Sequence, residues 1–158
     1  MNGIENIIDK IGFHGPIILG LWSIYLLKNQ FTYLMAYVVG FMVNTKINEA
    51  LKILIKQPRP KGCEEEFGKD TAHHYGMPSG HAQMAFFSIA FIYLTTKNQI
   101  VFLWMCLLGS ITLYQRYNRK CHSIPQLVMG AVTGSIISMS IYWITKYVCK
   151  NGICRIKI

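Results

Sequence analysis

Three clusters of polar residues in an otherwise apolar sequence have the composition for phosphate chemistry. The first reads Lys52-Ile-Leu-Ile-Lys-Gln-Pro-Arg59-Pro60. The prolines that flank Arg59 forbid a continuing helix, so Arg59 comes just after the end of an apolar stretch. Lys52 lies inside that stretch, where a cation is expected to face a partner within a helical bundle, although a snorkelling lysine would leave the same pattern. Glu49, three residues before Lys52, shares its helix face and is predicted to orient the lysine.

The second cluster reads Tyr75-Gly-Met-Pro78-Ser79-Gly80-His81 and runs into an apolar stretch. A turn made of Pro78, Ser79 and Gly80 at the start of a helix leaves backbone N–H groups and a hydroxyl directed at one place, which is a binding site for an anion. His81, in the first turn, could exchange a proton with the bound group. The alternative is an ordinary serine cap with a neighbouring histidine.

The third cluster reads Arg116-Tyr-Asn-Arg119-Lys120-Cys-His122-Ser-Ile-Pro-Gln126. Arg116 supplies a third cation, and His122 is a candidate nucleophile that follows it by six residues. If a helix starts near Ser123, Gln126 lies one turn away from His122 and is predicted to hydrogen-bond its ring. Taken alone, a histidine at this point is more often a residue of the membrane interface.

Five apolar stretches surround these clusters, at residues 11–27, 31–55, 79–96, 99–115 and 125–148. A helix needs roughly 20 residues to cross the hydrocarbon core of a bilayer. Hydrophobic residues make up 52% of the 158-residue chain and charged residues only 15%, which leaves too little polar sequence to coat a soluble globule. We therefore expect one domain, residues 1–158, that is an all-α integral membrane bundle of about five transmembrane helices.

The first ten residues predict a short N-terminal helix on the membrane surface. Their isoleucines recur at helical spacing, with Glu5, Asp9 and Lys10 on the opposite side. The segment lacks the basic start and the cleavage site of a signal peptide.

Helices that alternate in direction bring the polar residues to one side of the membrane. The loops at 56–77 and 116–125 share that side with the amino terminus, whereas the loops at 28–30 and 95–98 lie on the other side with the carboxyl tail. The sequence therefore predicts an active site at one membrane face. Cys63 and Cys121 fall in the two loops of that face, and the spacing leaves open whether they are close enough to bridge.

The net charge and the spacing of histidines and cysteines argue against several other functions. The net charge is +9, but the basic residues are dispersed, which argues against a nucleic-acid partner. His73 and His74 lie near Glu64, Glu65, Glu66 and Asp70 at irregular spacing, so we predict no metal site there. The five cysteines have no zinc-site spacing, and no cofactor is expected.

The order of the three clusters resembles that of the type-2 phosphatidic acid phosphatase superfamily over roughly residues 45–135. The signatures of that family are a Lys followed after six residues by Arg-Pro, then Pro-Ser-Gly-His, then Ser-Arg with a His and an Asp downstream. The first two match in full. In the third, Gln115 stands in place of the usual Ser and Gln126 in place of the usual Asp.

Within that superfamily the sequence is most similar to the dolichyl-diphosphatase branch. That branch has Asn-Glu before its lysine, a Tyr-Gly-Met-Pro-Ser motif with a following His and Gln, and a Gln after the nucleophilic histidine. The matching positions here are Asn48-Glu49, the segment from Tyr75 to Gln83, and Gln126.

The resemblance implies a shared mechanism with five catalytic residues: Lys52, Arg59, His81, Arg116 and His122. The three cations would bind the phosphoryl oxygens in place of a metal ion, and Ser79 with the Gly80 N–H would complete the cradle. His122 would form a phosphohistidine, and His81 would protonate the leaving oxygen. The resemblance also places such a site on the lumenal face of the endoplasmic reticulum. Lysine and arginine counts divide evenly between the two sides and give no orientation.

We expect a polyprenyl diphosphate as the substrate. The alternatives are phosphatidic acid or another lipid monophosphate, and an inactive homologue that only binds lipid phosphates. After Asp70 the chain has no acidic residue, so His122 has no downstream carboxylate. An uncharged Gln126 would make it a weaker nucleophile, which suits a good leaving group. The alternative is that an upstream carboxylate such as Glu49 or Asp70 folds in to take that place. The sequence leaves the oligomeric state and the chain length of the lipid open.

Overall fold

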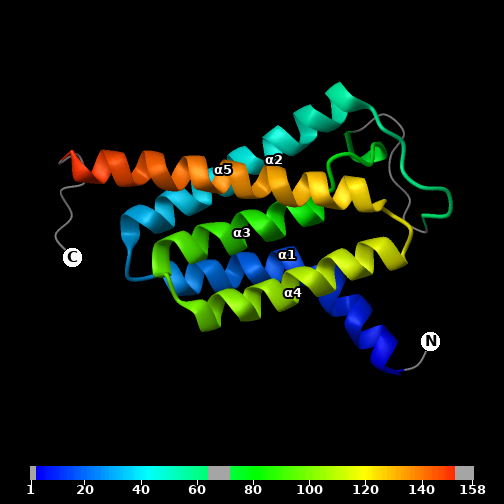
Figure 1. Cartoon of the computed structure of the whole chain (residues 1–158), viewed down its shortest axis with the longest axis horizontal. Coiled ribbons are helices and arrows are strands. Elements are labelled where there is room, and N and C mark those ends of the chain that lie inside the picture. Colours follow the sequence, from blue (N-terminus) through cyan, green and yellow to red (C-terminus); the bar gives the residue numbers. More distant parts are fainter. Residues whose placement is uncertain (1–2, 64–71, 152–158) are drawn as a thin grey trace.

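The computed structural model describes residues 3–63 and 72–151, and these residues form a bundle of helices (Figure 1). The elements in chain order are α1 (Gly3–Leu27), α2 (Phe31–Ile55), the short 3₁₀ helix η1 (Ala72–His74), α3 (Gly80–Thr96), α4 (Gln99–Asn118) and α5 (Ile124–Lys150). Within the described ranges no β-strand forms, and a single bridge pairs Pro58 with Tyr75. The expected all-α fold is confirmed.

Helix α3 is the centre of the bundle because it contacts each of the other four long helices. Its buried residues Phe87 and Phe91 stack on one another, and Tyr37 of α2 contacts Phe87 at a tilt and Phe91 edge-on. Helix α5 lies close against α3 at Gly134, where an added Cβ would collide with the backbone carbonyl of Gln83. Small residues at helix contacts let backbones pack closely, which is how helices associate in a bilayer.

The outer surface of the bundle is apolar. Among the described residues, three helices are long and apolar enough to cross a membrane: Glu5–Leu27, Gln99–Asn118 and Ile124–Lys150. Large hydrophobic side chains such as Leu21, Trp104 and Ile144 are exposed on their outer faces. The chain is an integral membrane protein. Helix α2 carries three charged residues in its second half and α3 has only 17 residues, so the total of five spans stays a prediction.

The expected separate surface helix at the amino terminus is not observed. Residues 3–10 are instead the first turns of α1, which continues without a break to Leu27. Asp9 is bound by Arg119 beyond the end of α4, which holds these turns against the bundle. The turns bend away from the rest of α1 (Figure 1), and Pro16 lies within the helix, a usual cause of a bend.

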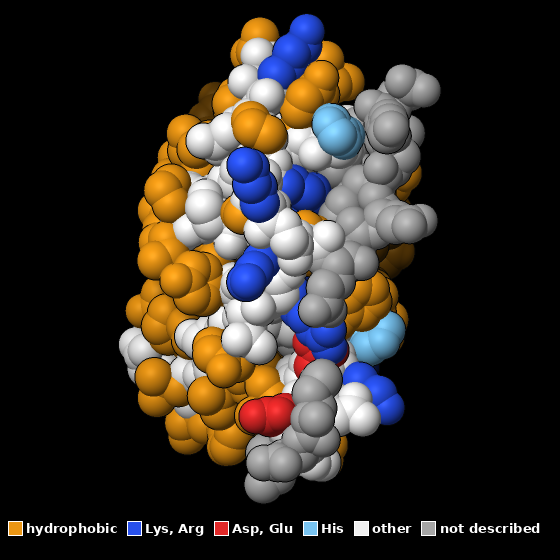
Figure 2. Space-filling model, turned by 90° about the vertical axis from the view of Figure 1, so that its right-hand side faces the viewer, with side chains coloured by type: hydrophobic (Ala, Val, Ile, Leu, Met, Phe, Trp, Pro, Cys, Tyr) orange, Lys and Arg blue, Asp and Glu red, His pale blue; other side chains and the backbone are white. Residues whose placement is uncertain are grey.

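The polar loops gather at one end of the bundle. The segment after α2, the turn before α3 and the turn between α4 and α5 all lie at the end that also holds the amino terminus, whereas α5 ends at the opposite end (Figure 1). Lys and Arg side chains gather across this end, and hydrophobic side chains follow its flanks (Figure 2).

Close packing between α3 and α5 can be tested by substitution. Gly134→Val should destabilise the bundle by about 1–3 kcal/mol, because overpacking forces backbone shifts. Thermal unfolding of the purified protein in detergent measures the change. Gly3→Ala is the matched control, since an added Cβ there has no atom within 4 Å. Equal melting temperatures for Gly134→Val and the wild type would contradict the close approach of these helices.

Candidate active site

A cavity of about 160 Å³ lies at the polar end of the bundle and collects residues from all three sequence clusters. It is lined by Thr45, Asn48, Glu49, Lys52, Arg59, Gly80, His81, Met84, Arg116 and His122. The list includes all five residues that the sequence analysis predicted to be catalytic. Three of its side chains are cationic and one is acidic, so the cavity is suited to an anion.

Lys52 is held by a backbone carbonyl. Its side chain is 2% exposed, and Nζ donates a hydrogen bond of 2.6 Å to the carbonyl oxygen of Tyr75. Tyr75 directly follows η1, which packs against α2. The carbonyl fixes the position of the ammonium group and leaves its other N–H donors available for a ligand.

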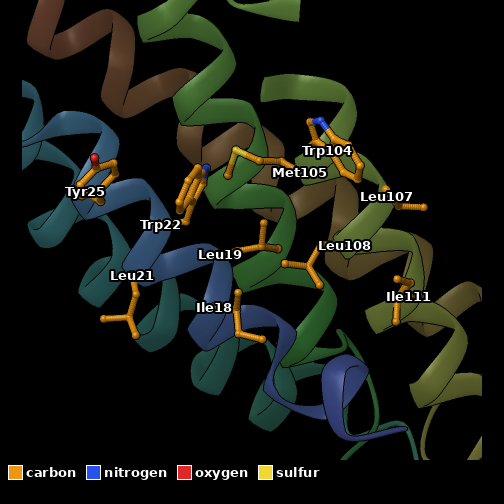
Figure 3. Close-up of a pocket in the computed structure, with 10 residues that line it drawn as sticks. All are labelled: Ile18, Leu19, Leu21, Trp22, Tyr25, Trp104, Met105, Leu107, Leu108 and Ile111. Atoms are coloured by element: carbon orange, nitrogen blue, oxygen red, sulfur yellow. The ribbon is translucent and has the colours of Figure 1, made fainter. Parts of the chain in front are cut away.

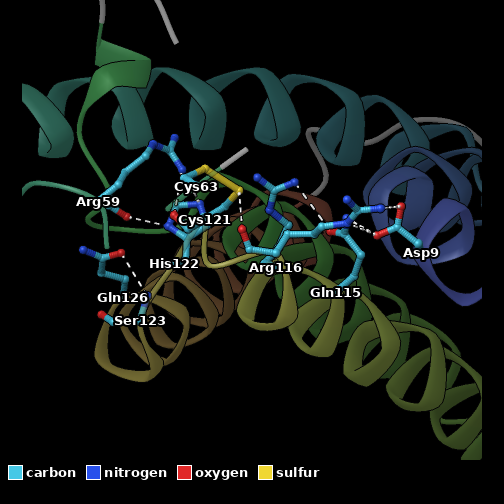
Figure 4. Close-up of a disulfide and its surroundings, with 11 residues drawn as sticks. Asp9, Arg59, Cys63, Gln115, Arg116, Cys121, His122, Ser123 and Gln126 are labelled. Carbon is cyan, nitrogen blue, oxygen red and sulfur yellow. Dashed lines mark hydrogen bonds and ion pairs between the residues drawn. A yellow bond between two sulfur atoms is a disulfide. The ribbon is translucent and has the colours of Figure 1, made fainter. Parts of the chain in front are cut away.

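Arg59 joins the first cluster to the third. Its Nη1 donates to the carbonyl oxygen of Cys121 at 3.0 Å and lies 3.0 Å from Nε2 of His122 (Figure 4). On the other side of the ring, Nδ1 of His122 lies 2.9 Å from the carbonyl oxygen of Gly76. A carbonyl only accepts and a guanidinium only donates, so Nδ1 carries the proton and Nε2 directs its lone pair at the guanidinium of Arg59, which also lines the cavity.

The surroundings of His122 keep its ring neutral. Burial is the largest cause and holds the pKa of His122 well below its usual range, and the positive charges of Arg59 and Arg116 act in the same direction. A neutral imidazole with an unprotonated Nε2 is the form that attacks phosphorus.

Arg116 and His81 reach the cavity from two further helices. Arg116 is in the last turn of α4, where the helix dipole favours a cation, and its side chain is 1% exposed. His81 is in the first turn of α3, and its ring packs against Phe13 of α1 with 5.7 Å between ring centroids.

The turn before α3 is held from behind by polar side chains. Asn48 donates to the carbonyl oxygen of Pro78 at 3.3 Å and to Oε1 of Gln83 at 2.8 Å. Ser79 caps α3 by accepting from the Ala82 N–H at 3.5 Å. Of the three residues predicted to bind substrate, Gly80 lines the cavity, whereas Ser79 and Pro78 are buried and are not among the lining residues. The pairing of Asn48 with Gln83 explains why both occur together, which the sequence alone did not reveal.

The predicted contact of Gln126 with the His122 ring is wrong. Gln126 Nε2 donates to Oε1 of Gln57 at 3.1 Å and to the carbonyl oxygen of Pro58 at 2.9 Å, and Oε1 accepts from the Ser123 N–H. Its amide packs directly against Gly76, where any Cβ would collide with it. The backbone of Gly76 therefore supplies the acceptor for the ring, and Gln126 supports that backbone.

The predicted pairing of Glu49 with Lys52 is also wrong. Glu49 accepts from Nζ of Lys46 at 2.9 Å, three residues earlier on the same helix. Lys52 points instead to the loop carbonyl of Tyr75. A carboxylate with lysines three residues away on both sides has two possible partners, and α2 alone does not decide between them. Glu49 nevertheless lines the cavity.

A disulfide joins the two loops that carry Arg59 and His122. Cys63 and Cys121 are bonded with 4.6 Å between their Cα atoms, and 58 positions separate them in the chain (Figure 4). Closing a loop of that length stabilises a folded chain by about 4 kcal/mol in the chain-entropy account. The sequence placed both cysteines on this face but gave no distance between them.

The acidic residues near the histidine pair, Glu64 to Glu66 and Asp70, lie outside the described residues. In the described part of the chain, no three His, Cys, Asp or Glu side chains come together as metal ligands.

The sequence matches the model of the PAP2 superfamily over residues 33–149. The chain belongs to the PAP2 superfamily. Curated relatives include the dolichyldiphosphatase of Saccharomyces cerevisiae, 30% identical over 72% of this chain and 52% of that protein. Another is lipid phosphate phosphatase epsilon 2, chloroplastic, of Arabidopsis thaliana, 31% identical over 91% of this chain and 50% of that protein. The chain thus spans about half the length of these PAP2 relatives.

The fold is also similar to a solved PAP2 structure. A transmembrane PAP2-type phosphatidylglycerolphosphate phosphatase from Bacillus subtilis superposes with a TM-score of 0.67 at 16% identity, over 99% of this chain and 81% of that one. This similarity supports the PAP2 fold.

The protonation state of His122 can be measured directly. Because burial and neighbouring cations depress its pKa, the ring should stay neutral at pH 5, where an ordinary histidine is mostly protonated. Nitrogen NMR of histidine-labelled protein in detergent reports the state, and His122→Asn assigns the signal. A His122 ring that titrates near pH 6.5 would contradict this view of the site.

Proposed function

We propose that this chain removes the terminal phosphate of a polyprenyl diphosphate, of the dolichyl type, through a phosphohistidine on His122. The observation that carries the proposal is the unprotonated Nε2 of His122, 3.0 Å from Arg59 inside a cavity that Lys52 and Arg116 also line. A nucleophile surrounded by cations is the arrangement that phosphoryl transfer requires.

In the first half of the reaction, Arg59 exchanges its hydrogen bond to Nε2 of His122 for the phosphoryl oxygens, and Nε2 attacks the terminal phosphorus. The bond between that phosphorus and the bridging oxygen breaks, and the lipid monophosphate leaves with a proton from His81. Lys52, Arg59 and Arg116 neutralise the charge on the transferred oxygens. The Nδ1–H bond to the Gly76 carbonyl holds the ring in the attacking orientation throughout.

In the second half, His81 takes a proton from a water molecule, whose oxygen attacks the phosphohistidine. The P–N bond breaks, inorganic phosphate leaves, and His122 returns to its neutral form. Both halves use the same three cations, so no step is routed through a metal ion.

The acceptor of the His122 ring favours a diphosphate. A carbonyl fixes the tautomer as a carboxylate would, but it lacks the negative charge that stabilises an imidazolium-like state. His122 is therefore a weak nucleophile that needs a good leaving group. A diphosphate expels a lipid monophosphate with a pKa of ~6, whereas a monoester expels a much more basic alkoxide.

An apolar groove beside the cavity supports a lipid substrate. The groove, about 330 Å³ between α1 and α2, shares Met84 with the cavity wall and is otherwise lined by residues such as Ile17, Gly20 and Phe41. A lipid whose head group is bound in the cavity could place its hydrocarbon chain in this groove, next to the bilayer. A larger groove of about 700 Å³ between α1 and α4 shares no lining residue with the cavity (Figure 3).

Phosphatidic acid or a related monoester is the second candidate, because the relatives include lipid phosphate phosphatases as well as dolichyldiphosphatases. A binding protein without activity would keep the cations, but it has no need of a neutral histidine with a directed lone pair.

We also propose that the catalytic face lies in the lumen of the endoplasmic reticulum. The Cys63–Cys121 disulfide lies at this face, and disulfides persist in oxidising compartments and rarely in the cytosol. The dolichyldiphosphatase relatives are consistent with that organelle.

Phosphate release by purified protein in detergent tests the reaction. Wild type should strongly prefer polyprenyl diphosphate to phosphatidic acid and should keep its activity in a chelator. His122→Ala should abolish turnover without unfolding the bundle, and His81→Ala should leave a slow enzyme that accumulates phosphohistidine. More than a trace of activity in His122→Ala, or equal rates on the two lipids, would refute the assignment of nucleophile or substrate respectively.

Thiol labelling of sealed microsomes tests the orientation. With a membrane-impermeant maleimide outside, Cys149 in the last turn of α5 should react, and we expect the same of Cys154, which lies outside the described residues. Cys63 and Cys121 should react only after permeabilisation and reduction. The Cys63→Ser/Cys121→Ser variant identifies the protected signals. Labelling of Cys63 and Cys121 from outside without reductant, or an oxidised Cys149–Cys154 pair in cells, would show the reverse orientation.

A further inference from the structure

A carboxylate outside the active site is connected to one of its cations. Asp9 lies in the first turns of α1, and its Oδ1 accepts from Nε2 of Gln115 at 3.0 Å (Figure 4). The same carboxylate accepts two hydrogen bonds of 2.7 Å from Arg119, one on each oxygen. Two separate donors from the end of α4 therefore meet on Asp9.

Gln115 passes this contact on to Arg116. Its Oε1 accepts from Nη1 of Arg116 at 3.5 Å, and its side chain is only 3% exposed. A carboxylate accepts only, so Asp9 requires the amide to present its NH₂ group. The amide oxygen then has to face the other way, where the guanidinium of Arg116 lies. Asp9 thus determines which way the Gln115 amide is turned.

Close packing of α1 on α4 holds this chain of contacts in place. At Gly12, one turn after Asp9, an added Cβ would collide with the side chain of Gln115. At Gly15, a further turn along, it would collide with the hydroxyl of Thr112. The two glycines therefore bring the backbone of α1 against the last turns of α4, within reach of the Asp9 carboxylate.

We propose that Asp9 is a positioning residue for Arg116, which it orients through the side-chain amide of Gln115. The family signature has a serine at the position of Gln115. Of the two side chains, only the longer glutamine spans the distance between Asp9 on α1 and the guanidinium of Arg116. This proposal rests on the proposed phosphatase reaction, in which Arg116 neutralises charge that develops during phosphoryl transfer. Its orientation then matters more in the transition state than in the bound substrate.

The first variant removes the side-chain amide of Gln115 and keeps the charges of Asp9 and Arg116. Gln115→Met keeps a similar volume, and it should lower kcat by about tenfold, with KM changed less than twofold, since hydrogen bonds to charged groups are among the stronger ones. Asp9→Ala should lower kcat to a similar degree. The double variant Asp9→Ala/Gln115→Met should be no slower than Gln115→Met alone, because both changes break one chain of contacts.

Arg119→Gln is the matched control. It removes the ion pair to Asp9 and leaves the bond from Asp9 to Gln115, so it should lower the melting temperature while kcat stays within twofold of wild type. A Gln115→Met enzyme with wild-type kcat, or losses that multiply in the double variant, would overturn the proposal.

The kinetic comparison uses whichever lipid phosphate the wild type hydrolyses, so a wrong choice of lipid leaves the test intact. A wild type that hydrolyses no lipid phosphate would refute the proposed function instead. Asp9 would then be tested by orthovanadate, a phosphate analogue that can adopt the five-coordinate geometry of the transition state, with thermal shift as the readout. Gln115→Met and Asp9→Ala should weaken its apparent affinity by about tenfold and Arg119→Gln should not, for the same loss of a charge-assisted hydrogen bond. Equal affinities in all four proteins would reject the role of Asp9.

Discussion

Three cations held around one small cavity inside an apolar bundle are the constraint on which the rest of this structure depends. Lys52 and Arg116 are almost completely buried, and Arg59 reaches in from a loop to meet His122. Like charges in a poorly hydrated site repel one another and lose their solvation, so each cation needs hydrogen-bond partners that hold it in the cavity. An arrangement of this kind is most stable when an anion occupies it. The preference of the cavity for an anion and the need for rigid anchors thus have the same origin.

Backbone carbonyls provide most of those anchors. Tyr75, Gly76 and Cys121 present their carbonyl oxygens to Lys52, His122 and Arg59 respectively. Irregular backbone near a bilayer is tolerated where its polar groups are satisfied within the protein, and here side chains that line the cavity satisfy them. The loops and these side chains therefore stabilise each other. Asp9, on the far side of Gln115, connects a further carboxylate to this system from a distance.

The sequence predicted the features that follow from helix periodicity and motif order. The boundaries of α2 and the gathering of all three clusters at one end required only the lengths of the apolar stretches. Side-chain partners were less predictable. Gln126 lies one turn from His122, but the backbone of Gly76 occupies the space between them, although it comes 50 positions before Gln126 in the chain. The acceptor of Lys52 and the partner of Asp9 likewise come from distant segments, whose approach depends on how the helices pack.

The disulfide also restricts how the chain threads the bilayer. Cys63 and Cys121 are bonded, so both lie on the same side of the membrane, and the segment between them contains α3 and α4. A chain that leaves one side and returns to it crosses an even number of times. Helix α4 is long and apolar enough to cross, and if it does, α3 has to make the return crossing although it has only 17 residues. The covalent bond between the two loops thereby makes the crossing of α3, which its length alone does not predict, depend on the crossing of α4.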